Sequence, residues 1–105
     1  MRVWILCEAF TLTGDAFGHQ TVHESIRPWS VACESRKVVM RELKEAVAEA
    51  VCGNWEGADA DEEIESDIRL VMNSKMHLGR GIYKYGYSTS DREVVWMVYP
   101  QEVIT

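Results

Sequence analysis

Apolar and polar residues follow a strand-like pattern at both ends of the chain. Residues 2–10 are rich in β-branched and aromatic side chains and predict a central strand. Residues 82–88 and 92–99 predict two more strands, and the Thr-Ser-Asp between them is typical of a hairpin connection. The two ends of the chain are therefore expected to supply the main strands of a sheet.

Two weaker strand patterns follow the first strand. They cover residues 19–24 and 29–33, and Arg27-Pro28 lies between them. Proline disfavours a continuous central strand because it has no backbone N–H to donate. The sequence therefore predicts a break between these two segments.

The middle of the chain has the three- and four-residue spacing of amphipathic helices. Residues 36–52 place valine, leucine and alanine on one stripe, with Ser35 as the expected N-cap and Gly53 as the expected stop. Residues 61–75 carry a second stripe of isoleucine, valine and methionine, which glycines beyond it are expected to end.

Helices gathered between strands predict an α+β fold. We expect an antiparallel sheet made of the N-terminal strand and the C-terminal hairpin, with one or two extra strands, and two helices on one face. With 105 residues and no linker-like run, the chain is expected to form a single α+β domain over residues 1–105.

Negative charge is concentrated in one stretch of the chain. Residues 42–67 contain ten carboxylates and one base, a net charge of −9, whereas the whole chain carries −6. A chain this acidic is a poor ligand for nucleic acid, because phosphate binding needs cations. An acidic surface favours a basic protein partner instead, and it can present negative charge in place of phosphates.

The two helices differ in how well a local rule explains their carboxylates. Those at the start of the second helix are stabilised by the helix dipole, by about 0.3–1 kcal/mol each. The first helix opposes its dipole, with Arg36 and Lys37 in the first turn and Glu49 in the last, although Arg41 and Glu45 can pair one turn apart. A local rule that is broken without local gain marks a candidate for function.

A tryptophan lies between the two helices, inside the acidic stretch. Trp55 stands in Gly-Asn-Trp-Glu-Gly and has the character of an interface hot spot. The alternative is that it folds back as a lid on the helix pair, and a solvated helix surface is the competing explanation for the carboxylates. The candidate partner-binding residues are Glu42, Glu45, Glu49, Trp55, Glu56, Asp59 and Asp61.

A close pair of histidines offers a second candidate site. On extended chain His19 and His23 lie about 13 Å apart, too far to share a zinc ion whose ligand nitrogens are about 2 Å from the metal. The loop from Asp15 to His23 could instead form a small-ligand site or a minor enzyme's site facing the tyrosine strand.

Three alternating tyrosines, Tyr83, Tyr85 and Tyr87, share one face of a predicted strand. The segment around them matches the RNA-recognition-motif signature poorly, since three of its positions and the order of elements depart from it. An aromatic sheet face of this kind could instead make a homodimer.

Several classes of function lack their usual sequence signals. No complete catalytic, phosphate-binding or metal motif is present, so no catalytic residue, metal or cofactor is predicted. The three cysteines are far apart and form no CxxC pair, which favours a reducing cytoplasm. No apolar run reaches the roughly 20 residues that span a bilayer. We therefore expect a cytoplasmic protein that is not an enzyme and has no membrane partner.

In layout and composition the whole chain resembles small inhibitor proteins encoded by phages and mobile elements, including the anti-CRISPR type. No specific motif carries this resemblance, and no residue roles follow from it. It implies an inhibitor that acts through a protein–protein surface. The expected partner is a basic host protein or nucleoprotein complex, engaged by nucleic-acid mimicry.

Overall fold

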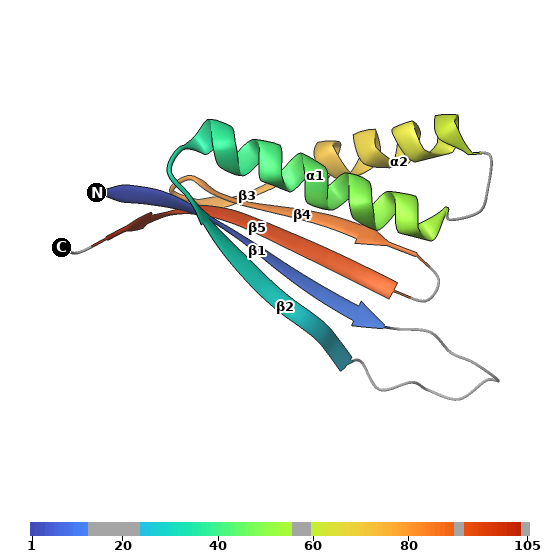
Figure 1. Ribbon diagram of the computed structural model, residues 1–105, viewed down its shortest axis with the longest axis horizontal. Helices are drawn as coiled ribbons and strands as arrows, with labels where there is room; N and C mark the ends of the chain where they lie inside the picture. Colours follow the sequence, from blue (N-terminus) through green and yellow to red (C-terminus); the bar gives the residue numbers. More distant parts are fainter. Residues whose placement is uncertain (13–23, 56–59, 90–91, 104–105) are drawn as a thin grey trace.

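The computed structural model describes residues 1–12, 24–55, 60–89 and 92–103. Within them, five strands form one antiparallel sheet and two helices lie across one of its faces (Figure 1). The elements are β1 (Arg2–Leu12), β2 (Glu24–Cys33), α1 (Arg36–Asn54), α2 (Asp61–Asn73), β3 (Met76–Gly79), β4 (Ile82–Ser88) and β5 (Arg92–Glu102). The predicted α+β class and the C-terminal hairpin are confirmed.

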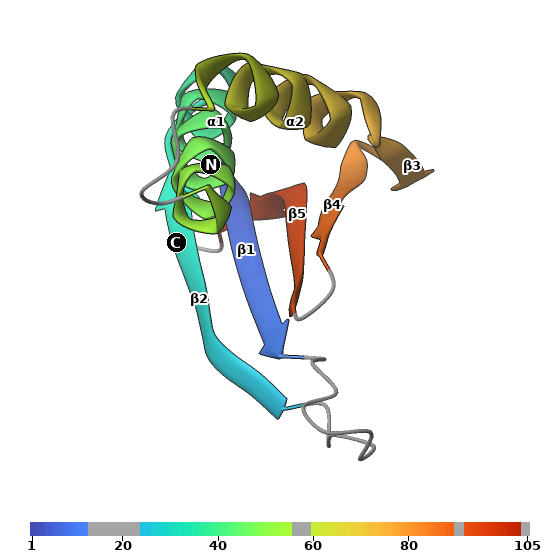
Figure 2. The same ribbon diagram turned by 90° about the vertical axis from the view of Figure 1, so that its right-hand side faces the viewer.

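The strand order is β2-β1-β5-β4-β3, so the N-terminal strand lies beside the last strand at the centre of the sheet. Both helices cover the same face, α1 over β1, β2 and β5 and α2 over β4 (Figure 2). α1 begins where the sequence predicts, with Ser35 as its N-cap. The Ser35 hydroxyl accepts a hydrogen bond from the Val38 N–H at 3.2 Å.

The predicted break around Arg27-Pro28 is wrong, because β2 is continuous through both residues. Trp29 pairs with Glu8 and Ile26 with Phe10, so β2 has one residue more than β1 between these pairs. This extra residue forms a bulge, and β2 is an edge strand. Proline is tolerated at bulges and edges because no ladder hydrogen bond is lost there. Residues 19–23 lie outside the described part of the chain.

A short strand replaces the expected end of the second helix. α2 stops at Asn73, and Met76–Gly79 then pairs with β4 as β3. Gly79 and Gly81 do not end the helix but turn β3 into β4, with φ of 146° and 73°. Glycine adopts such positive φ values without the strain that a side chain would add.

The hydrophobic core lies between the helices and the covered face of the sheet. Trp96 is fully buried, and its Nε1 donates a hydrogen bond to Glu8 Oε2 at 2.7 Å. The core side chains are Leu6, Cys33, Val39, Leu43, Ala46, Val47, Val51, Val71, Tyr85, Tyr87, Val94, Trp96 and Val98.

The tyrosine face is the covered face. Tyr85 and Tyr87 are only 2% and 8% exposed, under the helical layer, and Tyr83 is half-buried. These rings are therefore not available to stack on RNA bases or to form a homodimer, and that alternative is wrong. Neither helix lies over the opposite face of the sheet (Figure 2).

Candidate protein-binding surface

The glutamates of α1 form a stripe along one flank of the helix. Glu42, Glu45 and Glu49 follow one another at three- and four-residue spacing, which places them on the same side of a helix. Glu45 and Glu49 are exposed and Glu42 is half-buried. We call these three residues the glutamate stripe.

Two neighbours show which way the glutamate stripe faces. Glu49 lines an open hollow of about 420 Å³ with Glu8 and Phe10 of β1 and Arg92 of β5. Burial raises the pKa of the Cys33 thiol on β2, and the charge of Glu42 raises this pKa further. The glutamate stripe therefore lies on the β1 and β2 side of α1, away from α2 (Figure 2).

The glutamate stripe forms no ion pair within the described part of the chain. None of its carboxylates lies within 4.0 Å of a described basic group, and the Arg41–Glu45 pair expected one turn apart does not form. An ion pair recorded there joins Arg2 Nε at the start of β1 to Glu102 Oε1 at the end of β5, at 3.1 Å.

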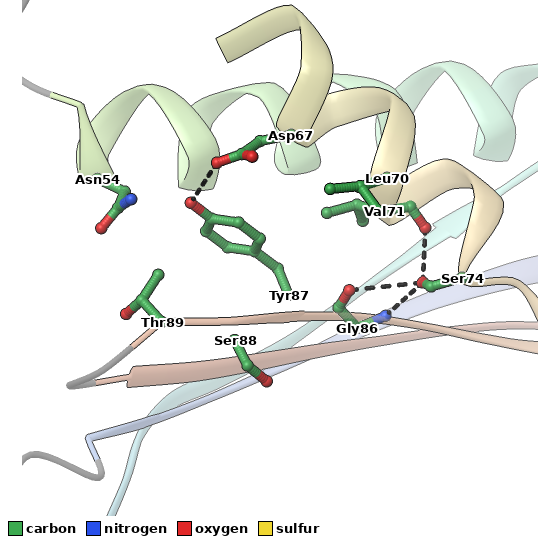
Figure 3. A pocket seen from close by; sticks show the side chains of 9 residues that line it. All are labelled: Asn54, Asp67, Leu70, Val71, Ser74, Gly86, Tyr87, Ser88 and Thr89. Carbon is green, nitrogen blue, oxygen red and sulfur yellow. Dashed lines mark hydrogen bonds between the residues drawn. The ribbon is translucent and has the colours of Figure 1, made fainter. Parts of the chain in front are cut away.

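Trp55 does not belong to this exposed surface. It caps the C-terminus of α1, is half-buried against the core, and donates from Nε1 to Asp67 Oδ2 at 3.0 Å. Tyr87 donates to the same oxygen from its hydroxyl, at 3.2 Å (Figure 3). Of the two alternatives for Trp55, the structure takes the folded-back one, and it separates this residue from the glutamate stripe.

Of the remaining candidate residues, the structure describes Asp61. Asp61 is exposed in its first turn with Glu62 and Glu63, where the helix dipole stabilises carboxylates. Glu56 and Asp59 lie outside the described residues. The structure thus groups the three glutamates of α1, places Asp61 at the end of the helical layer where α1 finishes (Figure 1), and turns Trp55 inward.

A groove of about 450 Å³ runs between α2 and β4 (Figure 3). Its acidic group, Asp67, is engaged by Trp55 and Tyr87. At its other end Ser74 Oγ accepts from the Gly86 N–H at 3.1 Å and donates to the Val71 carbonyl at 2.6 Å. These hydrogen bonds join α2 to β4 and to the end of α1.

Metal and histidine chemistry are not assembled in the described part of the chain. There, no three His, Cys, Asp or Glu side chains gather as a metal site requires. His19, His23 and the rest of the loop from Asp15 lie outside the described residues. The tyrosine strand that this loop was expected to face is covered by the helices.

A cluster of cations and rings was missed by the sequence analysis. The Tyr83 ring stacks on His77 at 5.0 Å, Lys75 Nζ lies 5.1 Å from the ring centroid, and Arg36 Cζ lies 5.9 Å from it. Such cation–π contacts are worth about 0.5–1 kcal/mol at exposed sites. The contact with Tyr83 explains the position of Arg36 in the first turn of α1, whereas Lys37 and Glu49 are not explained by it.

Comparisons of the chain with protein-family models, curated proteins and solved structures find no match. No helix among the described residues is long and apolar enough to cross a membrane.

Proposed function

We propose that the protein is a non-enzymatic binding protein, an inhibitor or accessory factor, that engages a basic protein through the glutamate stripe. The partner is a protein or nucleoprotein complex whose own cationic surface holds nucleic acid. The observation that carries this proposal is that Glu42, Glu45 and Glu49 share one helix flank and form no ion pair with a described base.

Unpaired carboxylates on a rigid helix attract a cationic surface at long range. The three carboxylates lie on one flank of the helix, so their negative potentials add on that side. This raises the rate of encounter with a positively charged partner. The same charges repel nucleic acid, so the protein would compete with nucleic acid for a cationic groove. This competition is the mode of action expected of an inhibitor of the anti-CRISPR type.

Trp55 has no part in the proposed contact. Its indole N–H is held by Asp67, and its ring packs on the core. The contact therefore consists of the glutamate stripe, and the carboxylates at the start of α2, Asp61 among them, lie outside it, because the dipole of α2 accounts for them. Because Trp55 is not part of the contact, variants that change only the charge of the stripe can test the proposal.

The test compares two variants with the same change in charge. Glu45→Lys/Glu49→Lys reverses two charges of the glutamate stripe, and Glu62→Lys/Glu65→Lys reverses two exposed charges of α2. Each is immobilised beside the wild-type protein, exposed to a cell extract and eluted in salt steps. We expect cationic proteins held by wild type and by the α2 variant to be lost from the stripe variant.

Competition with DNA makes the test specific. Excess double-stranded DNA should displace the retained protein, and release should occur at moderate salt, because salt screens exposed charges. Retention that is equal on the stripe variant, with unchanged salt dependence, would overturn the proposal. Far-UV circular dichroism of both variants establishes that the helices are intact.

A further inference from the structure

The sheet face opposite the helices is apolar at its centre. On the two central strands, side chains alternate between the covered face and this open face, and Cys7 of β1 pairs with Met97 of β5. Lys84 of β4 lies beside Met97, and Met76 of β3 lies beside Lys84. We define the open sheet face by the apolar residues Val3, Ile5, Cys7, Ala9, Ile82, Val95, Met97 and Tyr99.

The two central strands have the composition of strands that are buried on both sides. Val-Trp-Ile-Leu-Cys in β1 and Val-Val-Trp-Met-Val-Tyr in β5 are continuous apolar runs. Such runs are typical of strands covered on both faces, whereas a strand with one wet face alternates between apolar and polar residues. In the single chain only one face of these strands is covered by helices.

The open sheet face has the size of a protein interface. With strands about 4.8 Å apart and a rise of about 3.3 Å per residue, the five strands give a face of roughly 20 by 30 Å, or about 600 Å², of which the three strands that carry the apolar residues supply about 450 Å². Stable interfaces bury about 800 Å² per partner, and crystal-packing contacts mostly bury less than about 400 Å² per partner. The area is therefore of the order that one stable dimer contact needs.

The helical layer and the open sheet face differ in charge, and this difference favours the open sheet face as the contact with a second copy. On the helical layer α2 carries five carboxylates and one base, so two copies that met through this helix would repel each other. The open sheet face carries one exposed base, Lys84, and one exposed acid, Glu93, among its described residues on β4 and β5. In a twofold contact each partner supplies both charges, so the base of one copy can face the acid of the other.

The surface is also hollowed where a partner's side chain could enter. Gly86 has no side chain, and around it Met76, Lys84, Glu93 and Val95 line an open depression of about 200 Å³. Bulky side chains at the centre of the face and a depression beside them suit packing against a copy of the same surface.

We propose that a second copy of this chain covers the open sheet face, giving a twofold, face-to-face dimer of sheets. The dimer turns both helical layers outward, so each copy keeps its glutamate stripe exposed. This inference does not rest on the proposed function, because the stripe and the open sheet face lie on opposite sides of the sheet.

The experiment measures the mass of the full chain by sedimentation equilibrium between about 1 and about 500 µM, the range of a moderate dissociation constant. We expect the mass to rise towards twice the 12.0 kDa of one chain. Met97→Glu should weaken association about a hundredfold or more, because the contact would then bury a carboxylate, and the base of Lys84 beside it does not offset the full cost of desolvation.

Leu70→Glu is the matched control, because Leu70 is 66% exposed on α2, on the other side of the molecule, and receives the same charge. It should leave the dissociation constant unchanged. Val95→Lys is a second probe of the same face with the opposite charge, for use if Met97→Glu does not melt cooperatively.

A wild-type chain that stays at 12.0 kDa over the whole range would overturn the dimer. So would a dimer that Met97→Glu and Val95→Lys leave intact while Leu70→Glu dissociates it. Loss of extract binding in the stripe variant, with the dimer retained, would separate the two proposals.

Discussion

The two faces of the central strands have similar apolar content and very different surroundings. Leu6 and Trp96 point under the helices and are fully buried, whereas Cys7 and Met97, their neighbours in sequence, lie on the open sheet face and are half-exposed. The difference arises from what lies above each face, because both faces are made by the same two strands. The apolar pattern along a strand thus indicates which side chains are suited to burial. The packing of the other elements determines which of them are buried.

The largest expected effect separates these two faces within one strand. Trp96→Ala should lower the free energy of unfolding by about 3–5 kcal/mol, because it leaves a large cavity in the core. It also leaves Glu8 without the Nε1 donor at 2.7 Å. Chemical denaturation followed by far-UV circular dichroism measures the loss.

Met97→Ala is the matched comparison for the open sheet face. In dilute solution, where the dimer is dissociated, it should cost about 1 kcal/mol or less, as substitutions outside the core usually do. At concentrations where the dimer forms, the cost should grow with protein concentration. Equal losses for the two variants in dilute solution would contradict the assignment of one covered and one open face.

The next effect concerns the contact that holds the helical layer to the covered face. Asp67→Ala removes the acceptor shared by Trp55 and Tyr87, at 3.0 and 3.2 Å. We expect a loss of about 1–3 kcal/mol, because two donors that are partly buried lose their partner. Asp61→Ala, at an exposed carboxylate of the same helix, should cost about 0.3–1 kcal/mol through the helix dipole alone. A loss for Asp67→Ala no larger than this would contradict the role of Asp67.

A smaller effect is expected where the helical layer meets β4 at Gly86, beyond the residues of β4 that pair with β3. Ser74→Ala removes the hydroxyl that accepts from the Gly86 N–H, and it should cost about 1 kcal/mol. The more specific measurement is amide hydrogen exchange, which should become faster at Gly86, since exchange reports local opening. Ser66→Ala, at an exposed position of α2, serves as the control. Unchanged exchange at Gly86 would show that the hydroxyl does not hold this part of β4.

Much of the fold could be predicted because its signals are local. The spacing of Val39, Leu43 and Val47 marks one side of α1, and the alternation in β4 and β5 marks a hairpin. β3 was missed because four residues next to glycines carry too little pattern. The continuity of β2 through Pro28 depends on its place at the edge of the sheet, which is a property of the whole fold.

The candidate surface could be predicted only in part, because the sequence shows local spacing but not the contacts between distant residues. The glutamate stripe follows from helical spacing, and the structure brings its three members together. The direction of Trp55 depends on Asp67, twelve residues away, and on Tyr87 in a different strand. The tyrosine strand shows the same limit, because alternation places its rings on one face without indicating that helices cover that face.

The smallest expected effect compares tyrosines on the two faces by their titration. Burial raises the pKa of Tyr85 on the covered face above its ordinary value of 10.0. On the open sheet face the pKa of Tyr99 is also raised, mainly by its hydrogen-bonding contact with Cys7 at 3.7 Å and then by burial. The folded chain then holds protons that the unfolded chain releases, so stability is fully present below about pH 10 and falls as pH rises through the folded values.

Tyr85→Phe should therefore flatten the alkaline fall in unfolding free energy, while leaving stability at neutral pH nearly unchanged. Cys7→Ala should shift the Tyr99 titration back towards its ordinary pKa of 10.0, seen as tyrosinate absorbance. Lysines also titrate in this range, so only the difference between variant and wild type is compared. If Cys7→Ala flattens the fall and Tyr85→Phe does not, the alkaline sensitivity belongs to the open sheet face. Burial under the helices would then not be its cause.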